Sequence, residues 1–291
     1  LETFITGVTL PGGKADVMFI LDLSGSMVEN TDSKGVTRLA RLKEATNKFI
    51  DVLSKTDSRI SIVTFNEDAS LRTSPAFTTV KGNESSLKEL VNGFNARVST
   101  RIDKGAQEGL KAFKAQSDLP ENRFCIILTD GVPGMDSKPD YKVAQDTWQT
   151  TYEMKDMGVK VYTIFLGEDG TSKKLSENCR FDETDFLMYA YDFLDGTSSN
   201  FKKAYYNLET TKKERIEEKW CVFSDPSNRK RPSKITDTNH VTRNSNDYFK
   251  KVPNPEDLES IFEAIAKEIA VASLPLNADN TTIKDVISSD F

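Results

Sequence analysis

The chain has 291 residues, of which 37% are hydrophobic and 29% charged, as in a globular protein. No apolar run approaches the ~18 residues that a membrane span requires, and residues 1–10 lack the basic start and long apolar core of a signal peptide. The formal net charge of −6 argues against a dedicated nucleic-acid binder, whose surface is basic. The length exceeds that of a usual single domain, but one large α/β sheet with an insertion accommodates it.

The first predicted strand covers residues 15–23 and ends in a group of oxygen-bearing side chains. The apolar run VMFIL is followed by Asp22, Ser24 and Ser26 at alternate positions. In a loop that leaves a strand, alternate side chains can turn toward one point, and we expect Gly25 to supply the backbone conformation of that turn. Carboxylate and hydroxyl oxygens suit Mg²⁺, Ca²⁺ or Mn²⁺ rather than zinc or copper. On this run alone, a simple loop in which Asp22 caps the next helix is an equal alternative.

The segment that follows is predicted to add two helices and two strands. Apolar residues at three- and four-residue steps indicate the helices, and short β-branched or alternating runs indicate the strands. The predicted elements are a helix at 38–55, a strand at 59–65, an antiparallel edge strand at 69–74 and a helix at 83–94. We expect the first of these helices to pack against the sheet through its apolar face.

A further candidate ligand, Thr100, stands in the turn before a predicted helix at 103–116. Gly105 and Gly109 lie on a face of this helix that can approach the sheet closely. The Thr100 hydroxyl either caps the helix or reaches a metal held at the end of the first strand, and the sequence leaves both interpretations open.

A third stretch repeats the pattern of the first strand. Residues 124–128 form a fully apolar predicted strand, and Thr129, Asp130 and Gly131 follow it. Two apolar strands that each end in an acidic turn are typical of a switch point, where neighbouring parallel strands open a crevice at their carboxyl ends. Taken alone, Asp130 is more simply a turn residue.

A predicted helix at 141–157 and a strand at 159–166 continue the alternation of strand and helix. Such alternation specifies a doubly wound α/β sheet with right-handed crossovers. The alternating strand and helix patterns are lost after this strand and return near the end of the chain. The remaining predictions are a helix and a strand within 185–206, a long surface loop at 225–246 that holds the lone His240, a last strand at 248–252, an amphipathic helix at 255–271 and an extended tail at 274–291.

The cysteines number three, too few for a disulfide scaffold, and they lack the CxxC spacing of a zinc site. Cys125 lies inside an apolar run and is predicted to be a buried thiol. Cys179 and Cys221 can pair only in an oxidising compartment, which the sequence leaves open.

Asp22, Ser24, Ser26, Thr100 and Asp130 together resemble the DxSxS…T…D signature of the metal-ion-dependent adhesion site in von Willebrand factor A and integrin I domains. The resemblance covers residues 15–167 and 247–271. It implies a six-stranded, mostly parallel, Rossmann-like sheet in a domain spanning 15–273, with an arm-like insertion at 168–247. It also implies that these five side chains hold Mg²⁺, with Mn²⁺ or Ca²⁺ as alternatives, and that an acidic residue of a protein ligand completes the coordination.

One residue departs from the family pattern. Ser99 stands where a glycine usually precedes the metal-binding threonine. In the family, movement of the last helix tunes ligand affinity, and the predicted helix at 255–271 is its counterpart here.

Within this family the chain resembles adhesins of Gram-positive bacterial surfaces and pili. The features that carry this resemblance are Met27 after DLSGS, the long insertion, the closing YFKKV…PEDLESIFEAIA and the tail TTIKDVISSDF. The resemblance implies an extracellular, wall-anchored or pilus location and a partner that is an extracellular-matrix or host-surface protein. It further implies a monomeric domain, without nucleic acid or a membrane span, in which residues 1–14 and 274–291 lead to neighbouring stalk domains.

Two other function classes compete with adhesion. The first is an intracellular A domain of the chelatase or ATPase-partner type, which uses the same site to engage another subunit. The second is a phosphatase of the haloacid dehalogenase type, which also places an aspartate nucleophile at a strand tip. That family needs a second Asp where Ser24 stands here, and no paired acid or base is evident, so we expect no enzymatic activity.

Overall fold

The structure is a computed structural model that describes residues 14–97, 99–118, 120–131, 134–135, 138–139, 141–167, 190–205, 236–237 and 248–272. Its centre is a sheet with the strand order β11-β8-β5-β1-β2-β3, to which a short β4 is added through β2. The strands are β1 (Ala15–Asp22), β2 (Arg59–Phe65), β3 (Ala69–Leu71), β4 (Thr78–Thr79), β5 (Asn122–Thr129), β8 (Lys160–Leu166) and β11 (Phe249–Val252). The expected doubly wound, mostly parallel sheet is therefore confirmed, with β4 as an addition to the six-stranded path.

The central strand β1 explains why the sheet forms. All eight of its residues are buried, because parallel neighbours flank it on both sides and helices cover both faces. Only β3 and β4, at the far edge, run antiparallel to their partner β2. A strand enclosed in this way reads as a continuous apolar run, which is the pattern that the sequence shows.

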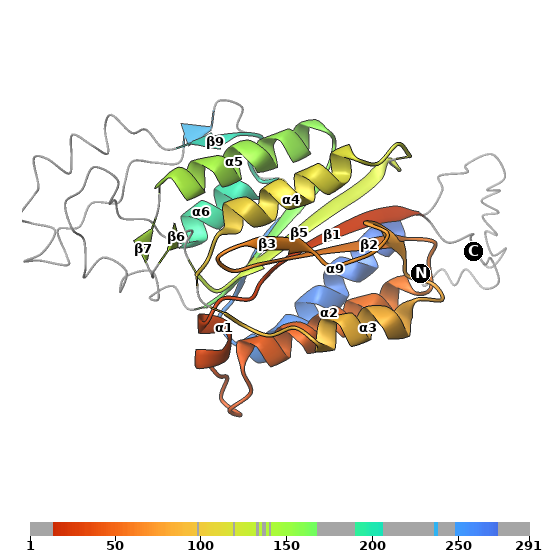
Figure 1. The fold of residues 1–291 in the computed structure, drawn as a ribbon, viewed down its shortest axis with the longest axis horizontal. Helices are drawn as coiled ribbons and strands as arrows, with labels where there is room; N and C mark the ends of the chain where they lie inside the picture. Colours follow the sequence, from red (N-terminus) through yellow and green to blue (C-terminus); the bar gives the residue numbers. More distant parts are fainter. Residues whose placement is uncertain are drawn as a thin grey trace, which may run out of the picture.

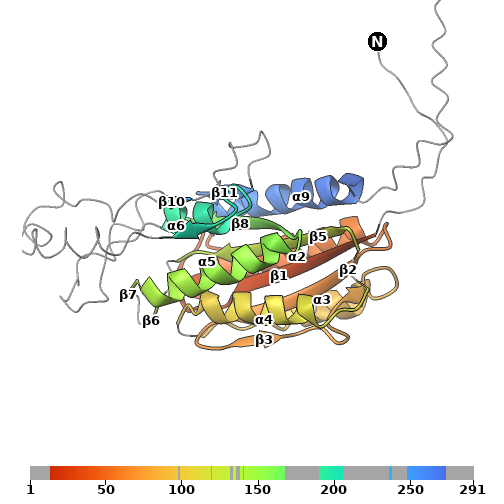
Figure 2. The ribbon, with the colours of Figure 1, turned by 90° about the horizontal axis from the view of Figure 1, so that it is seen from above.

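Helices cover the two faces of the sheet in separate layers (Figures 1 and 2). One layer consists of α2 (Arg38–Leu53), α3 (Glu84–Asn92) and α9 (Leu258–Ala272), which a short 3-10 helix at Pro255–Asp257 precedes. The other consists of α4 (Ile102–Lys114), α5 (Tyr141–Asp156) and α6 (Ala190–Thr197). The result is a three-layer αβα domain with one apolar core on each side of the sheet.

Alternate side chains of β1 point into the two cores. Phe19 faces the first layer, where its ring centroid lies 4.8 Å from that of Phe49 on α2 and 6.0 Å from that of Phe262 on α9. Ile20 faces the second layer and contacts α4. Both packing surfaces therefore depend on the strand that ends in Asp22.

Helix α4 lies unusually close to the sheet. A Cβ added at Gly105 would come within 2.9 Å of both Ile20 and Phe65, and one at Gly109 within 3.0 Å of Ile20. The expectation of a close helix face is confirmed. This approach fixes the amino end of α4, and so the turn that carries Thr100.

The irregular region confirms one prediction and corrects another. A helix and a strand are predicted within 185–206, and α6 and β9 lie there; α6 packs into the domain body through Phe193 and Leu194, since it contacts β8 and α5. Within the predicted loop at 225–246, β10 (Thr236–Asp237) pairs with β9 (Ala204–Tyr205), so the loop prediction is wrong at those two residues.

The remaining elements are short. Helix α1 (Ser26–Glu29) follows β1, and β6 (Gly134–Met135) pairs antiparallel with β7 (Lys138–Pro139). Cys125 is buried as predicted, whereas Cys179, Cys221, His240 and the tail at 274–291 lie outside the described residues. In the described part of the chain, no helix is both long and apolar enough to cross a membrane.

Candidate metal centre

The carboxyl ends of two neighbouring strands bring the acidic residues together. β1 and β5 pair in parallel with Leu21 opposite Leu128, Asp22 is the last residue of β1, and Asp130 directly follows β5. The two carboxylates therefore emerge at the same edge of the sheet, at the place where a doubly wound fold opens its crevice. The group Asp22, Ser24, Ser26, Thr100 and Asp130, which the sequence predicts to hold a cation, is called the metal centre below.

A chain of hydrogen bonds connects the first loop to the Asp130 loop. The Ser24 and Ser26 hydroxyl oxygens lie 3.0 Å apart, and the Ser26 hydroxyl donates to Asp130 Oδ1 at 2.6 Å. On the other side, the Thr129 hydroxyl donates to Asp22 Oδ2 at 2.5 Å. Four of the five predicted side chains thus lie within one hydrogen-bonded group.

The loop after β1 is held by its own backbone. The Ser24 amide donates to Asp22 Oδ1 at 2.7 Å, which turns the chain directly after the strand. Gly25 has an ordinary helical conformation, with φ −60° and ψ −36°, that any residue can adopt. The expectation that this turn needs a glycine conformation is therefore wrong.

Thr100 approaches the group from the third loop. A Cβ built on Gly131 would lie 3.9 Å from Thr100 Oγ1, so the Thr100 hydroxyl stands beside the Asp130 loop. The amino-terminal cap of α4 is Arg101, and no side chain caps this helix. Of the two interpretations left open, capping by Thr100 is not what the structure has.

Ser99 has a left-handed backbone with φ 72°, and it is the only described residue other than glycine with a positive φ. A side chain there is strained, because the left-handed region favours glycine. This conformation is the physical reason why a glycine suits the position before the threonine. The chain keeps the turn with serine at some cost in stability.

The electrostatics of the metal centre favour a cation. Asp22 is fully buried, Ser24 and Asp130 are nearly so, and Ser26 is half-buried. Burial, together with the nearby Asp130 carboxylate, raises the pKa of Asp22 to about 7, although hydrogen bonds from Thr129 and Ser24 act in the opposite direction. Arg38 offsets part of this charge, since its Nη1 lies 2.7 Å from Asp130 Oδ2.

The donor set fits a hard divalent cation. Two carboxylates and three hydroxyls are present, and oxygen ligands of this kind suit Mg²⁺, Ca²⁺ or Mn²⁺. Over the described ranges, no group of three or more His, Cys, Asp or Glu side chains could hold a metal, so the hydroxyls are essential to this arrangement. A bound cation would supply a Lewis-acidic centre for an oxygen atom of a partner.

Two residues that the sequence reasoning did not include take part in the site. Thr129 orients Asp22 through its hydroxyl and also accepts a hydrogen bond from the Gly131 amide at 3.1 Å. Thr129 could have been predicted, because it is next to Asp130 in the sequence. Nothing in the sequence points to Arg38, because its contact with Asp130 joins residues that are 92 positions apart.

Comparison with known proteins assigns the family. Residues 16–195, more than half of the chain, match the model of the von Willebrand factor type A domain. The chain therefore belongs to the von Willebrand factor type A domain family. No curated protein matches the sequence.

Several solved structures share the fold. BatB, a conserved hypothetical protein from Bacteroides thetaiotaomicron, is 15% identical with a TM-score of 0.51, over 88% of this chain and 98% of its own. The PilB minor pilin from Streptococcus sanguinis is 13% identical with a TM-score of 0.53, over 93% of this chain and 64% of its own. Proximal thread matrix protein 1 from the mussel byssus, with a zinc-occupied MIDAS motif, is 15% identical with a TM-score of 0.51, over 90% of this chain and 47% of its own. At these identities the likeness concerns the fold alone.

Proposed function

We propose that the domain is a metal-dependent adhesion module in which Asp22, Ser24, Ser26, Thr100 and Asp130 hold one divalent cation. The observation that carries the proposal is the 2.6 Å hydrogen bond from Ser26 to Asp130, because it joins two loops that lie 104 residues apart in sequence. Mg²⁺ is the proposed metal, with Mn²⁺ or Ca²⁺ as substitutes.

The roles of the side chains follow from their charge. Serine and threonine hydroxyls are neutral ligands, so two carboxylates alone offset the charge of the cation, and Arg38 already shares Asp130. Such a site remains short of negative charge. An aspartate or glutamate from a protein partner supplies it through a charge-assisted contact in a water-poor interface.

The proposed partner is an extracellular-matrix or host-surface protein, and the proposed location is a bacterial cell surface or pilus. The fold likeness to a minor pilin and to a matrix protein is in keeping with an extracellular role. No catalytic step is proposed, since the role of each side chain is to bind and orient.

A binding assay tests the proposal. The domain is applied to immobilised matrix proteins in Mg²⁺ and after its removal with EDTA, alongside Asp22→Ala and the control Asp57→Ala, which changes an exposed aspartate. We expect binding in Mg²⁺ by the wild type and the control, and loss of binding with EDTA and in Asp22→Ala. Binding that is unaffected by both treatments overturns the metal-dependent mechanism, and no binding to any matrix protein overturns the proposed partner class.

A further inference from the structure

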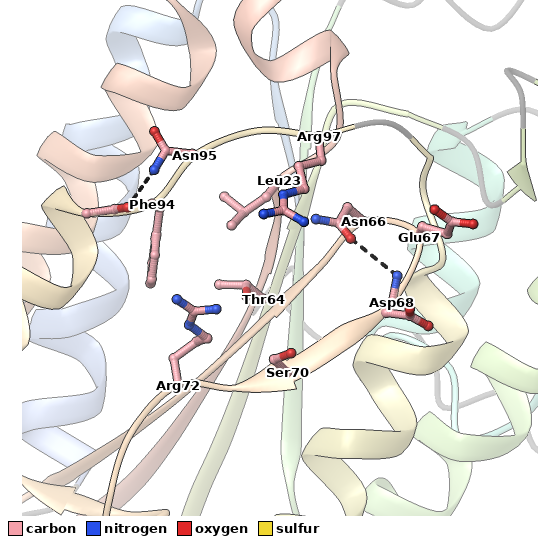
Figure 3. Close-up of a pocket in the computed structure, with 11 residues that line it drawn as sticks. Leu23, Thr64, Asn66, Glu67, Asp68, Ser70, Arg72, Phe94, Asn95 and Arg97 are labelled. Carbon is pink, nitrogen blue, oxygen red and sulfur yellow. Dashed lines mark hydrogen bonds between the residues drawn. The ribbon is translucent and has the colours of Figure 1, made fainter.

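A polar pocket of about 560 Å³ opens at one end of the sheet (Figure 3). Its walls come from the carboxyl end of β2, from β3 and from the segment after α3. The same loops build the metal centre, because the Arg97 amide donates to the Leu23 carbonyl at 2.7 Å and the Arg101 amide donates to the Asn66 carbonyl at 2.7 Å. The pocket and the metal centre therefore share one rim of the sheet.

The pocket exists because helix α3 ends before the sheet does. On β2, Ile60 and Ile62 belong to the core beneath the first helix layer. Thr64 is the next residue on that face and pairs across the strands with Ser70. Since α3 ends at Asn92, these polar residues form the floor of an open pocket instead of a core.

Two arginines supply the charge of the pocket. Arg72 and Arg97 are exposed, and Figure 3 shows their guanidinium groups turned toward the same space. In the part of the chain that the structure describes, neither of them forms an ion pair. By contrast, three less exposed arginines near this end of the fold each pair with a carboxylate: Arg38, Arg41 and Arg101. The guanidinium carbon of Arg72 lies 5.8 Å from the ring centroid of Phe94, which restrains its position.

The acidic residues of the rim do not neutralise these arginines. Asp68 pairs with Lys104 instead, and the carboxylates of Glu67 and Asp68 point away from the space between the two guanidinium groups (Figure 3). The interior of the pocket is therefore positive, although the chain as a whole is acidic.

The floor of the pocket carries a hydroxyl that is open to the pocket. Thr64 is only 5% exposed and lines the pocket. Its hydroxyl forms no hydrogen bond with any other residue that the structure describes. A hydroxyl without a protein partner that faces two cationic groups is placed to donate to the oxygen of an anion.

We propose that this pocket binds a carboxylate side chain of the same protein partner, as a second acidic contact next to the metal centre. The proposal rests on the proposed adhesive function for the identity of the partner, but the pocket itself needs no metal. The planar guanidinium groups of Arg72 and Arg97 match a carboxylate, and the Thr64 hydroxyl donates a further hydrogen bond. The partner then presents two acidic residues, of which one reaches the metal centre and the other the pocket.

The test uses a small probe and a protein without the metal centre. Acetyl-glutamate amide is titrated into ¹⁵N-labelled Asp22→Ala protein without divalent metal, and amide shifts are followed by NMR. We expect saturable shifts at Gly93, Asn95 and Arg97, and at least about a tenfold loss of affinity in Arg72→Gln and in Arg97→Gln. The matched control Lys81→Gln, which removes an exposed charge outside the pocket, should bind as the parent does.

The remaining outcomes separate this proposal from the metal site. Binding by Mg²⁺-loaded wild type that disappears in Asp22→Ala places the probe on the metal and overturns the pocket. Equal binding by the arginine variants, or by the neutral acetyl-glutamine amide, also overturns it. Tighter binding of inorganic phosphate than of the carboxylate overturns the assignment of ligand class. Thermal melts of each variant establish that it is folded.

Discussion

Arg38 Nη1 lies 2.7 Å from Asp130 Oδ2, where the Asp130 side chain is fully buried and that of Arg38 is 12% exposed. The metal centre therefore contains a fixed cation of its own. It stabilises the Asp130 carboxylate in the metal-free fold, and it also reduces the negative charge available to a metal.

Replacing Arg38 by glutamine should separate these two effects. The metal-free variant should lose about 2 kcal/mol of stability, because a buried carboxylate loses its charged partner. Mg²⁺ should then raise the melting temperature of the variant more than that of the wild type. Thermal melts with and without Mg²⁺ measure both quantities, with Lys43→Gln as a control on the same helix. An equal or smaller effect of Mg²⁺ in Arg38→Gln would contradict this role.

Ser99→Gly should stabilise the domain by about 1 kcal/mol. Ser99 has φ 72°, a conformation that glycine adopts without strain. The control Ser85→Gly lies within α3 and should destabilise by a similar amount, because glycine is a poor helix former. Urea denaturation of the metal-free proteins measures the difference. A loss of stability in Ser99→Gly would show that the serine side chain has a structural role.

Gly105→Ala should destabilise the domain by about 1–3 kcal/mol. The new methyl group would meet Ile20 and Phe65 at 2.9 Å, and the packed sheet cannot move away from it. The matched control is Gly93→Ala, since a Cβ there meets its nearest atoms at an ordinary 3.5 Å. Chemical denaturation should leave the control within about 0.5 kcal/mol of the wild type. Similar stability of the two variants would mean that α4 is not held tightly against the sheet.

The metal-free protein should become more stable as the pH falls from 8 to 5, relative to Asp22→Asn. Burial and the Asp130 carboxylate raise the pKa of Asp22 from 3.8 to about 7. A carboxyl group whose pKa is higher in the folded state favours unfolding when charged, and this penalty is relieved as the pH falls through 7 toward 3.8. Melting temperatures of both proteins across this range, without metal, measure the effect. A constant difference between them would show that Asp22 does not titrate there.

The sequence predicted the parts of this molecule that depend on local pattern. The buried strands are apolar runs, and parallel pairing alone places the ends of β1 and β5 side by side, which brings Ser26 to Asp130. The sequence did not predict a role for Arg38, because its contact with Asp130 depends on how α2 packs against the loop after β5. Helix α6 lies where apolar spacing predicts a helix, whereas the special backbone conformation predicted for Gly25 is wrong, because the Ser24 amide turns the chain by donating to Asp22.

Thr100 is the member of the metal centre with the fewest contacts to the others, since its hydroxyl lies beside Gly131 without a hydrogen bond to a described residue. If it is a ligand, its truncation should affect the metal more than the fold. Thr100→Ala should therefore change the free energy of unfolding of the metal-free protein by no more than about 0.5 kcal/mol. It should nevertheless weaken metal binding.

Calorimetric titration of Mg²⁺ into the wild type, Asp22→Ala and Thr100→Ala tests most directly whether these loops form one cation site. We predict one Mg²⁺ per domain in the wild type, weaker binding in Thr100→Ala and no binding in Asp22→Ala. The same stoichiometry and affinity in all three proteins would contradict the assignment of the site.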